Sequence, residues 1–129
     1  MNKKPRQILV VDDEEELVQS IQTSLEAQGY RVRTCSDGES ALGAIREEPP
    51  RLILLDLGLP KLDGHQVLRY LSANDLYSSI PVIVITGNQK IDELTATIAE
   101  GLTVSVYTKP LKLETLLNLV QTVLATAQD

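Results

Sequence analysis

Short runs of aliphatic residues alternate with segments of helical periodicity along almost the whole chain. The clearest runs are Ile8–Val11, Leu52–Leu55 and Pro81–Ile85, and weaker ones occupy residues 31–35 and 103–107. The clear runs are continuous, which is typical of strands covered on both faces. Because parallel strands require a crossover between them, usually a helix, this alternation predicts an α/β fold with a parallel sheet.

The intervening segments supply the helices that such a sheet needs. Apolar residues recur at helical spacing between Leu17 and Leu25, and Gly29 follows as a helix stop. A second helical pattern ends before Pro49, and further helices are expected at residues 66–72, 92–100 and 111–127. Five strand–helix units result. We expect a doubly wound (βα)5 sheet with helices on both faces and right-handed crossovers.

Length and composition exclude several kinds of protein. The 129 residues suit one domain, which we expect to span residues 1–129 with its core at about 7–126. The single cysteine excludes an internal disulfide, and with the single histidine it leaves no ligand set for structural zinc. The net charge of −6 argues against direct binding to nucleic acid. The apolar run behind the basic N-terminus is only Ile8–Val11, far below the ~20 residues of a membrane span, and the single cysteine suits a reducing compartment, so we expect a cytoplasmic protein without membrane contact.

Polar groups follow four of the five expected strands. In parallel sheets of this kind, ligands bind beyond the carboxyl ends of the strands, where the strand order reverses. We therefore expect these groups, although far apart in the sequence, to share one rim of the sheet. They are Asp12-Asp13 after the first strand, Asp56 after the third, Thr86-Gly87 after the fourth and Lys109-Pro110 after the fifth.

Each of these groups also has an ordinary structural explanation. The acidic run from Asp12 onwards is favourable charge at a helix N-terminus, and Asp56 is a common turn former. Thr86 can cap the next helix, and a lone Lys109 is most often a solvated surface residue. The combination is harder to explain in this way, because four strands end in groups that suit a single reaction.

That reaction is phosphoryl transfer. Three clustered carboxylates repel one another unless a cation joins them, and Mg²⁺ prefers such oxygen ligands, although Mn²⁺ could substitute. Asp56 then stays ionised and can act as a nucleophile on phosphorus. Lys109 and the Thr86 hydroxyl would stabilise the transferring phosphoryl group. Gly87 has no side chain and leaves the approach to Asp56 open.

The motifs that carry these groups resemble those of the response-regulator receiver domains of two-component signalling. The matching stretches are VVDDEE at 10–15, DLGLPKLDG at 56–64, TG at 86–87 and KP at 109–110. The resemblance covers about residues 7–126. It implies a flavodoxin-like sheet with strand order 2-1-3-4-5, as in the chemotaxis regulators.

The resemblance also implies a role for each site residue. Asp56 would accept a phosphoryl group from a phosphohistidine on a sensor histidine kinase or a histidine phosphotransfer protein. Asp12, Asp13, Asp56 and the backbone carbonyl of Gly58 would bind Mg²⁺. The Lys109–Pro110 bond is expected to be cis, and Pro60 and Gly64 would shape the metal-binding loop.

The expected activity is signalling rather than enzymatic turnover, with Mg²⁺-dependent self-phosphorylation and self-dephosphorylation. The resemblance implies that the signal passes to a downstream protein or to a fused effector. It also implies a monomer or a phosphorylation-dependent dimer.

One position departs from the receiver pattern. Most receivers carry Tyr or Phe three positions before the motif lysine, and that aromatic ring changes rotamer on activation. Here Val106 occupies that position and Tyr107 follows it. Successive strand side chains point to opposite faces, so Tyr107 is not expected in the usual place unless the strand is bulged. We hypothesise that output proceeds without rotation of a buried aromatic ring.

Three other functions fit less well. Phosphatases that form an aspartyl phosphate place a second Asp two residues after the nucleophile, where this chain has Gly58. A flavodoxin-like carrier needs a Ser/Thr/Gly-rich phosphate loop after the first strand, and an acidic run stands there instead. The alternative to a phosphoacceptor function is a receiver that has lost phosphorylation and serves only as a docking module.

Overall fold

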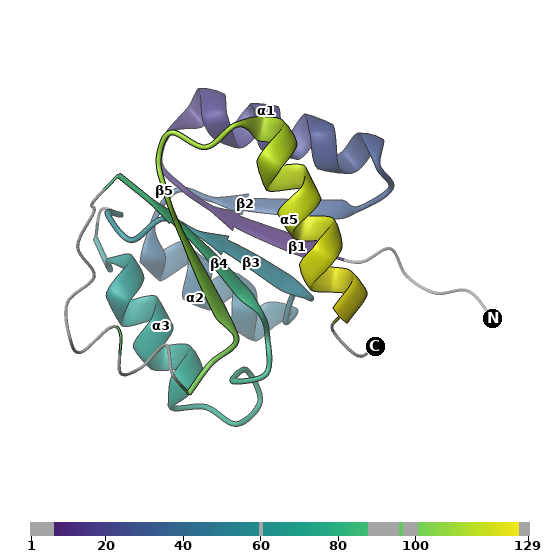
Figure 1. The fold of residues 1–129 in the computed structure, drawn as a ribbon. Coiled ribbons are helices and arrows are strands. Elements are labelled where there is room, and N and C mark those ends of the chain that lie inside the picture. The colour runs from purple at the N-terminus through teal and green to yellow at the C-terminus, as the bar shows by residue number, and fades with distance from the viewer. Residues whose placement is uncertain (1–6, 60, 88–95, 97–100, 127–129) are drawn as a thin grey trace.

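The computed structural model describes residues 7–59, 61–87, 96 and 101–126, and the strands among them form one parallel sheet (Figure 1). The strand order is β2-β1-β3-β4-β5, and every neighbouring pair is parallel. The expected α/β class and the expected strand order are therefore confirmed. The strands are β1 (Gln7–Val11), β2 (Arg31–Cys35), β3 (Leu52–Leu55), β4 (Val82–Thr86) and β5 (Val104–Thr108).

Four helices connect or follow the strands within the described residues. The helix expected at residues 92–100 lies almost wholly outside them. Helix α3 begins earlier than expected because Asp63 forms a capping box: its carboxylate accepts from Gln66 N at 3.0 Å, and Gln66 Oε1 accepts from Asp63 N at 3.1 Å. The helices are α1 (Glu15–Ala27), α2 (Gly38–Glu47), α3 (Gly64–Ser72) and α5 (Leu113–Thr126).

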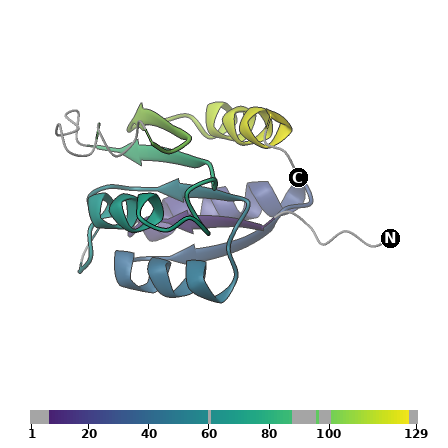
Figure 2. The same cartoon turned by 90° about the horizontal axis from the view of Figure 1, so that it is seen from below.

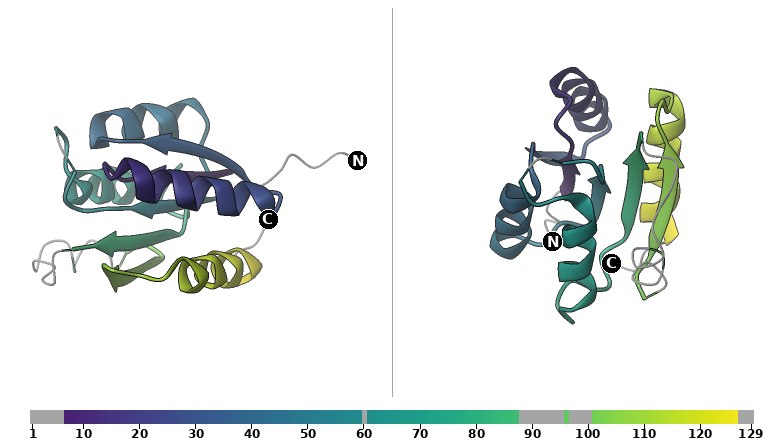
Figure 3. Two further views of the ribbon diagram at one scale, coloured as in Figure 1. Left: turned by 90° about the horizontal axis from the view of Figure 1, so that it is seen from above. Right: turned by 90° about the vertical axis from the view of Figure 1, so that its left-hand side faces the viewer.

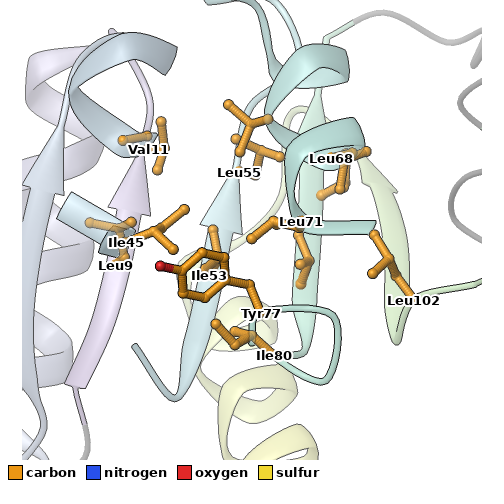
Figure 4. Close-up of a cluster of buried hydrophobic side chains, with 14 of the residues drawn as sticks. Leu9, Val11, Ile45, Ile53, Leu55, Leu68, Leu71, Tyr77, Ile80 and Leu102 are labelled. Atoms are coloured by element: carbon orange, nitrogen blue, oxygen red, sulfur yellow. The ribbon is translucent and has the colours of Figure 1, made fainter. Parts of the chain in front are cut away.

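The helices cover the two faces of the sheet in pairs, with α1 and α5 on one face and α2 and α3 on the other (Figures 2 and 3). Successive residues of each central strand point alternately into two hydrophobic cores, one between the sheet and α2–α3 and the other between the sheet and α1–α5. In β1, Leu9 packs with the α2–α3 core and Val10 with the α1–α5 core. Figure 4 shows the first core, where Ile45 of α2 and Leu71 of α3 meet the strand side chains.

The central strands are buried more completely than the edge strands. Every residue of β1, β3 and β4 is buried, whereas β2 has one buried residue, Val32, and β5 has none, and their other positions are half-buried or exposed. This difference explains why residues 31–35 and 103–107 have weaker apolar patterns in the sequence. Among the described residues, no helix is long and apolar enough to cross a bilayer.

Candidate functional site

The strand order places Asp12 and Asp56 side by side. After β1 the chain forms β2 on one side of it and then crosses back to form β3 on its other side. The carboxyl ends of β1 and β3 therefore lie on either side of the point where the strand order reverses. The backbone continues the pairing beyond the strands: Asp56 N donates to Val11 O at 2.9 Å, and Asp12 N donates to Cys35 O at 3.1 Å. The positions of both carboxylates are thus set by the sheet itself.

Three carboxylates form an acidic cluster at this rim. Asp12, Asp13 and Asp56 each offer an oxygen, and these oxygens lie within 4.8 Å of one another. Asp12 and Asp56 are buried and Asp13 is exposed. The pKa of Asp12 is raised overall, because burial disfavours the charged carboxylate. The hydrogen bond from Glu14 N and the contact with Lys109 lower the pKa but do not cancel this effect. A cluster of oxygen donors with buried negative charge fits a hard divalent cation such as Mg²⁺.

Lys109 reaches the acidic cluster from the end of β5. Its Nζ lies 3.0 Å from Asp12 Oδ2, 3.2 Å from Asp56 Oδ2 and 2.5 Å from Glu14 Oε1. Burial favours the neutral amine, but the hydrogen bonds to Glu14 and Asp12 and the charge of Asp56 raise the pKa of Lys109 overall. The Lys109–Pro110 bond is cis, as expected. Lys109 is therefore a charged counter-ion of the site.

The carboxyl end of β4 lies at the same rim of the sheet. Thr86 is the last residue of β4 and is 2% exposed, and its backbone oxygen accepts from Lys109 N at 2.9 Å. A Cβ added at Gly87 would meet no atom within 4 Å, in agreement with open space at that position. The contact of the Thr86 hydroxyl with a phosphoryl oxygen stays a prediction.

The loop after β3 is held close to the start of α3. Gly58 N donates to Asp56 Oδ1 at 3.1 Å, which orients the carboxylate, and Gly64 N donates to Leu57 O at 3.0 Å. A Cβ at Gly64 would lie 2.5 Å from Leu57 Cα, so only glycine allows this approach. Pro60 lies outside the described residues, and metal binding by the Gly58 carbonyl stays a prediction.

The structure separates the side chains of Val106 and Tyr107 as expected. Strand β5 pairs with β4 in regular register, with Val84 opposite Val106 and Ile85 opposite Tyr107. Tyr107 packs against the core between the sheet and helices α1 and α5, whereas Val106 is 41% exposed. Val106 belongs to the other face of the sheet, since successive strand residues alternate.

One contact of the site was missed from the sequence. The sequence groups Glu14 with the rest of the acidic run as charge at a helix N-terminus, and Glu15 and Glu16 do occupy the first turn of α1. Glu14 instead precedes the helix and forms an ion pair with Lys109 across 95 positions of sequence. Nothing local in the sequence distinguishes Glu14 from the two acids that follow it.

Comparisons with known proteins agree with this geometry. Residues 8–121 match the family described as the response regulator receiver domain. The alkaline phosphatase synthesis transcriptional regulatory protein PhoP of Bacillus subtilis is 48% identical over 90 residues, which is 70% of this chain and 35% of that protein. The response regulator MprA of Mycolicibacterium vanbaalenii is 35% identical over 113 residues, 88% of this chain and 48% of that protein. The chain thus spans about a third to a half of the length of these relatives.

Solved structures of similar fold cover nearly the whole chain. A putative response regulator from Chloroflexus aurantiacus has a TM-score of 0.79 and 30% identity, covering 95% of this chain and 99% of that one. The phosphorylated cyanobacterial phytochrome response regulator RcpA has a TM-score of 0.71 and 32% identity, covering 93% of this chain and 91% of that one.

Proposed function

This chain belongs to the response regulator receiver domain family, and on that premise we propose that Asp56 is the phosphoacceptor of a two-component signalling step. The observation that carries the proposal is the position of the Asp56 carboxylate: it is buried, oriented by Gly58 N, and 3.2 Å from the Lys109 ammonium. A buried carboxylate with a fixed orientation and an adjacent cation suits nucleophilic attack on phosphorus.

In the proposed step, an oxygen of Asp56 attacks the phosphorus of a phosphohistidine on a kinase or phosphotransfer protein. A bond from the Asp56 oxygen to phosphorus forms, and the bond from phosphorus to the histidine nitrogen breaks, with its electron pair going to the imidazole. Lys109 donates to the phosphoryl oxygens, and the Thr86 hydroxyl supplies a further donor. Gly87 leaves room beside them.

Asp12, Asp13 and Asp56 would hold Mg²⁺, with the Gly58 carbonyl as a further ligand. The bound ion would neutralise charge on the transferring phosphoryl group. The exposure of Asp13 beside two buried carboxylates supports a site that keeps bound water, as Mg²⁺ does.

The proposal extends to the partners of the domain. PhoP and MprA are named as regulators and are much longer than this chain, so we infer an output through a fused effector or a separate protein partner. RcpA was solved in phosphorylated form, which supports the same chemistry for this fold. We propose residues 7–126 as one receiver unit.

Intact-mass spectrometry after incubation with acetyl phosphate and Mg²⁺ tests the central assignment. Wild type is expected to gain one phosphoryl group, and Asp56→Asn none, because an amide is not a comparable nucleophile. Asp75→Asn is the matched control: Asp75 is exposed in the turn after α3, and its variant should gain the group as wild type does.

Three outcomes contradict the assignment. Equal gain by wild type and Asp56→Asn places the phosphoryl group elsewhere. No gain by the wild type favours a docking module that works without phosphorylation, whereas steady turnover of a simple phosphate ester favours a phosphatase.

A further inference from the structure

Lys109 contacts one more carboxylate than the proposed reaction uses. Its ammonium has three N–H groups, and Glu14 Oε1, Asp12 Oδ2 and Asp56 Oδ2 lie at 2.5, 3.0 and 3.2 Å. All three donors are therefore engaged. Asp12 and Asp56 belong to the acidic cluster, whereas Glu14 is not one of its members and its side chain is 58% exposed.

A divalent cation in the acidic cluster would use the same two buried carboxylates that Lys109 contacts. Two cations repel each other, so the contacts of Lys109 with Asp12 and Asp56 must weaken when the metal binds. The contact with Glu14 is the shortest of the three and uses no carboxylate of the acidic cluster. Glu14 is thus the partner that can retain the lysine at the edge of the site.

We propose that Glu14 is a positioning residue that draws the Lys109 ammonium off the metal-binding carboxylates and keeps it beside Asp56 once the metal is bound. This inference rests on the proposed function, because it takes the acidic cluster as the metal site. Without Glu14, Lys109 pairs more fully with Asp12 and Asp56 and competes with the metal for them.

Calorimetric titration with Mg²⁺ at fixed ionic strength tests the inference without any phosphorylation. Glu14→Gln is expected to weaken Mg²⁺ binding by about threefold to tenfold, the range of coupling between groups in one ion-pair network. Glu15→Gln is the matched control, because it removes the same charge one residue later, at the first residue of α1, and it should weaken binding by less than about twofold. Equal losses in the two variants would overturn the inference.

The same two substitutions in a Lys109→Met background separate an action through the lysine from direct metal binding. If Glu14 acts through Lys109, the difference between Glu14→Gln and Glu15→Gln disappears in that background. A difference that persists means that Glu14 meets the metal itself, and the inference is wrong. Far-UV circular dichroism verifies that each variant is folded.

Failure of the inference and failure of the proposed function give different results. A wild-type protein that binds no Mg²⁺ contradicts the proposed metal site and the inference together. A wild-type protein that binds Mg²⁺, with the Glu14 and Glu15 variants alike, contradicts the inference alone.

Discussion

Replacing Gly64 with alanine tests how closely the start of α3 must approach the loop that carries Asp56. A Cβ at position 64 would lie 2.5 Å from Leu57 Cα and 2.6 Å from the backbone oxygen of Asp56. Non-bonded carbon atoms rest at about 3.5–4.0 Å, so the helix or the loop must move by about 1 Å. Both contacted atoms belong to the backbone, and no side-chain rotation relieves the clash.

The expected effect on stability follows from this overlap. Overpacking costs about 1–3 kcal/mol, and the helix-interior gain of about 0.5–1 kcal/mol from Gly→Ala offsets little of it, because Gly64 is the first residue of α3. We therefore expect the free energy of unfolding to fall by about 1–2 kcal/mol. The effect on phosphorylation should be larger, because a displacement of about 1 Å near reacting atoms can slow a reaction by roughly a hundredfold.

Urea denaturation followed by far-UV circular dichroism measures the stability, since the chain has no tryptophan. The rate of phosphorylation by acetyl phosphate measures the geometry of the site. Gly43→Ala is the control: Gly43 lies inside α2 and an added Cβ meets no atom within 4 Å, so this variant should gain up to about 1 kcal/mol. Wild-type stability together with a wild-type rate in Gly64→Ala would refute the reasoning.

Three further outcomes are expected. Mg²⁺ at a hundred times its dissociation constant should stabilise the protein by about 2.7 kcal/mol, seen as a higher Tm, and Asp12→Asn should abolish most of this gain. The hydrogen bond from Ser40 N lowers the pKa of Asp37, the cap of α2, so its carboxylate stabilises the fold above its unfolded pKa and loses this effect as the pH falls below about 4. Asp37→Ala should therefore lower the Tm at pH 7 and matter less at pH 3. In crystals with a beryllofluoride phosphoryl mimic, the Tyr107 ring should stay packed against the α5 side of the sheet, and a ring that swings to the opposite face would contradict this.

Much of the site was predictable because its residues directly follow strands. The continuous aliphatic run before Asp56 marks β3 as a central strand, and the same holds for β1 before Asp12. The carboxyl ends of parallel strands meet at one rim, so strand assignment places both carboxylates there, and the strand order that the resemblance implied makes β1 and β3 neighbours. The separation of Val106 and Tyr107 onto opposite faces follows from the two-residue period of a strand in the same way.

The sequence by itself determined the approximate positions of the five strands and of the four described helices, and which polar groups stand at the strand ends, because these depend on patterns a few residues long. Only the tertiary structure decided that Lys109 divides its three donors among Asp12, Asp56 and Glu14, residues far from it in the chain. It also decided that Gly64 must approach the backbone after Asp56. Such contacts depend on strand order, register and helix placement to within an ångström, and local periodicity does not contain them.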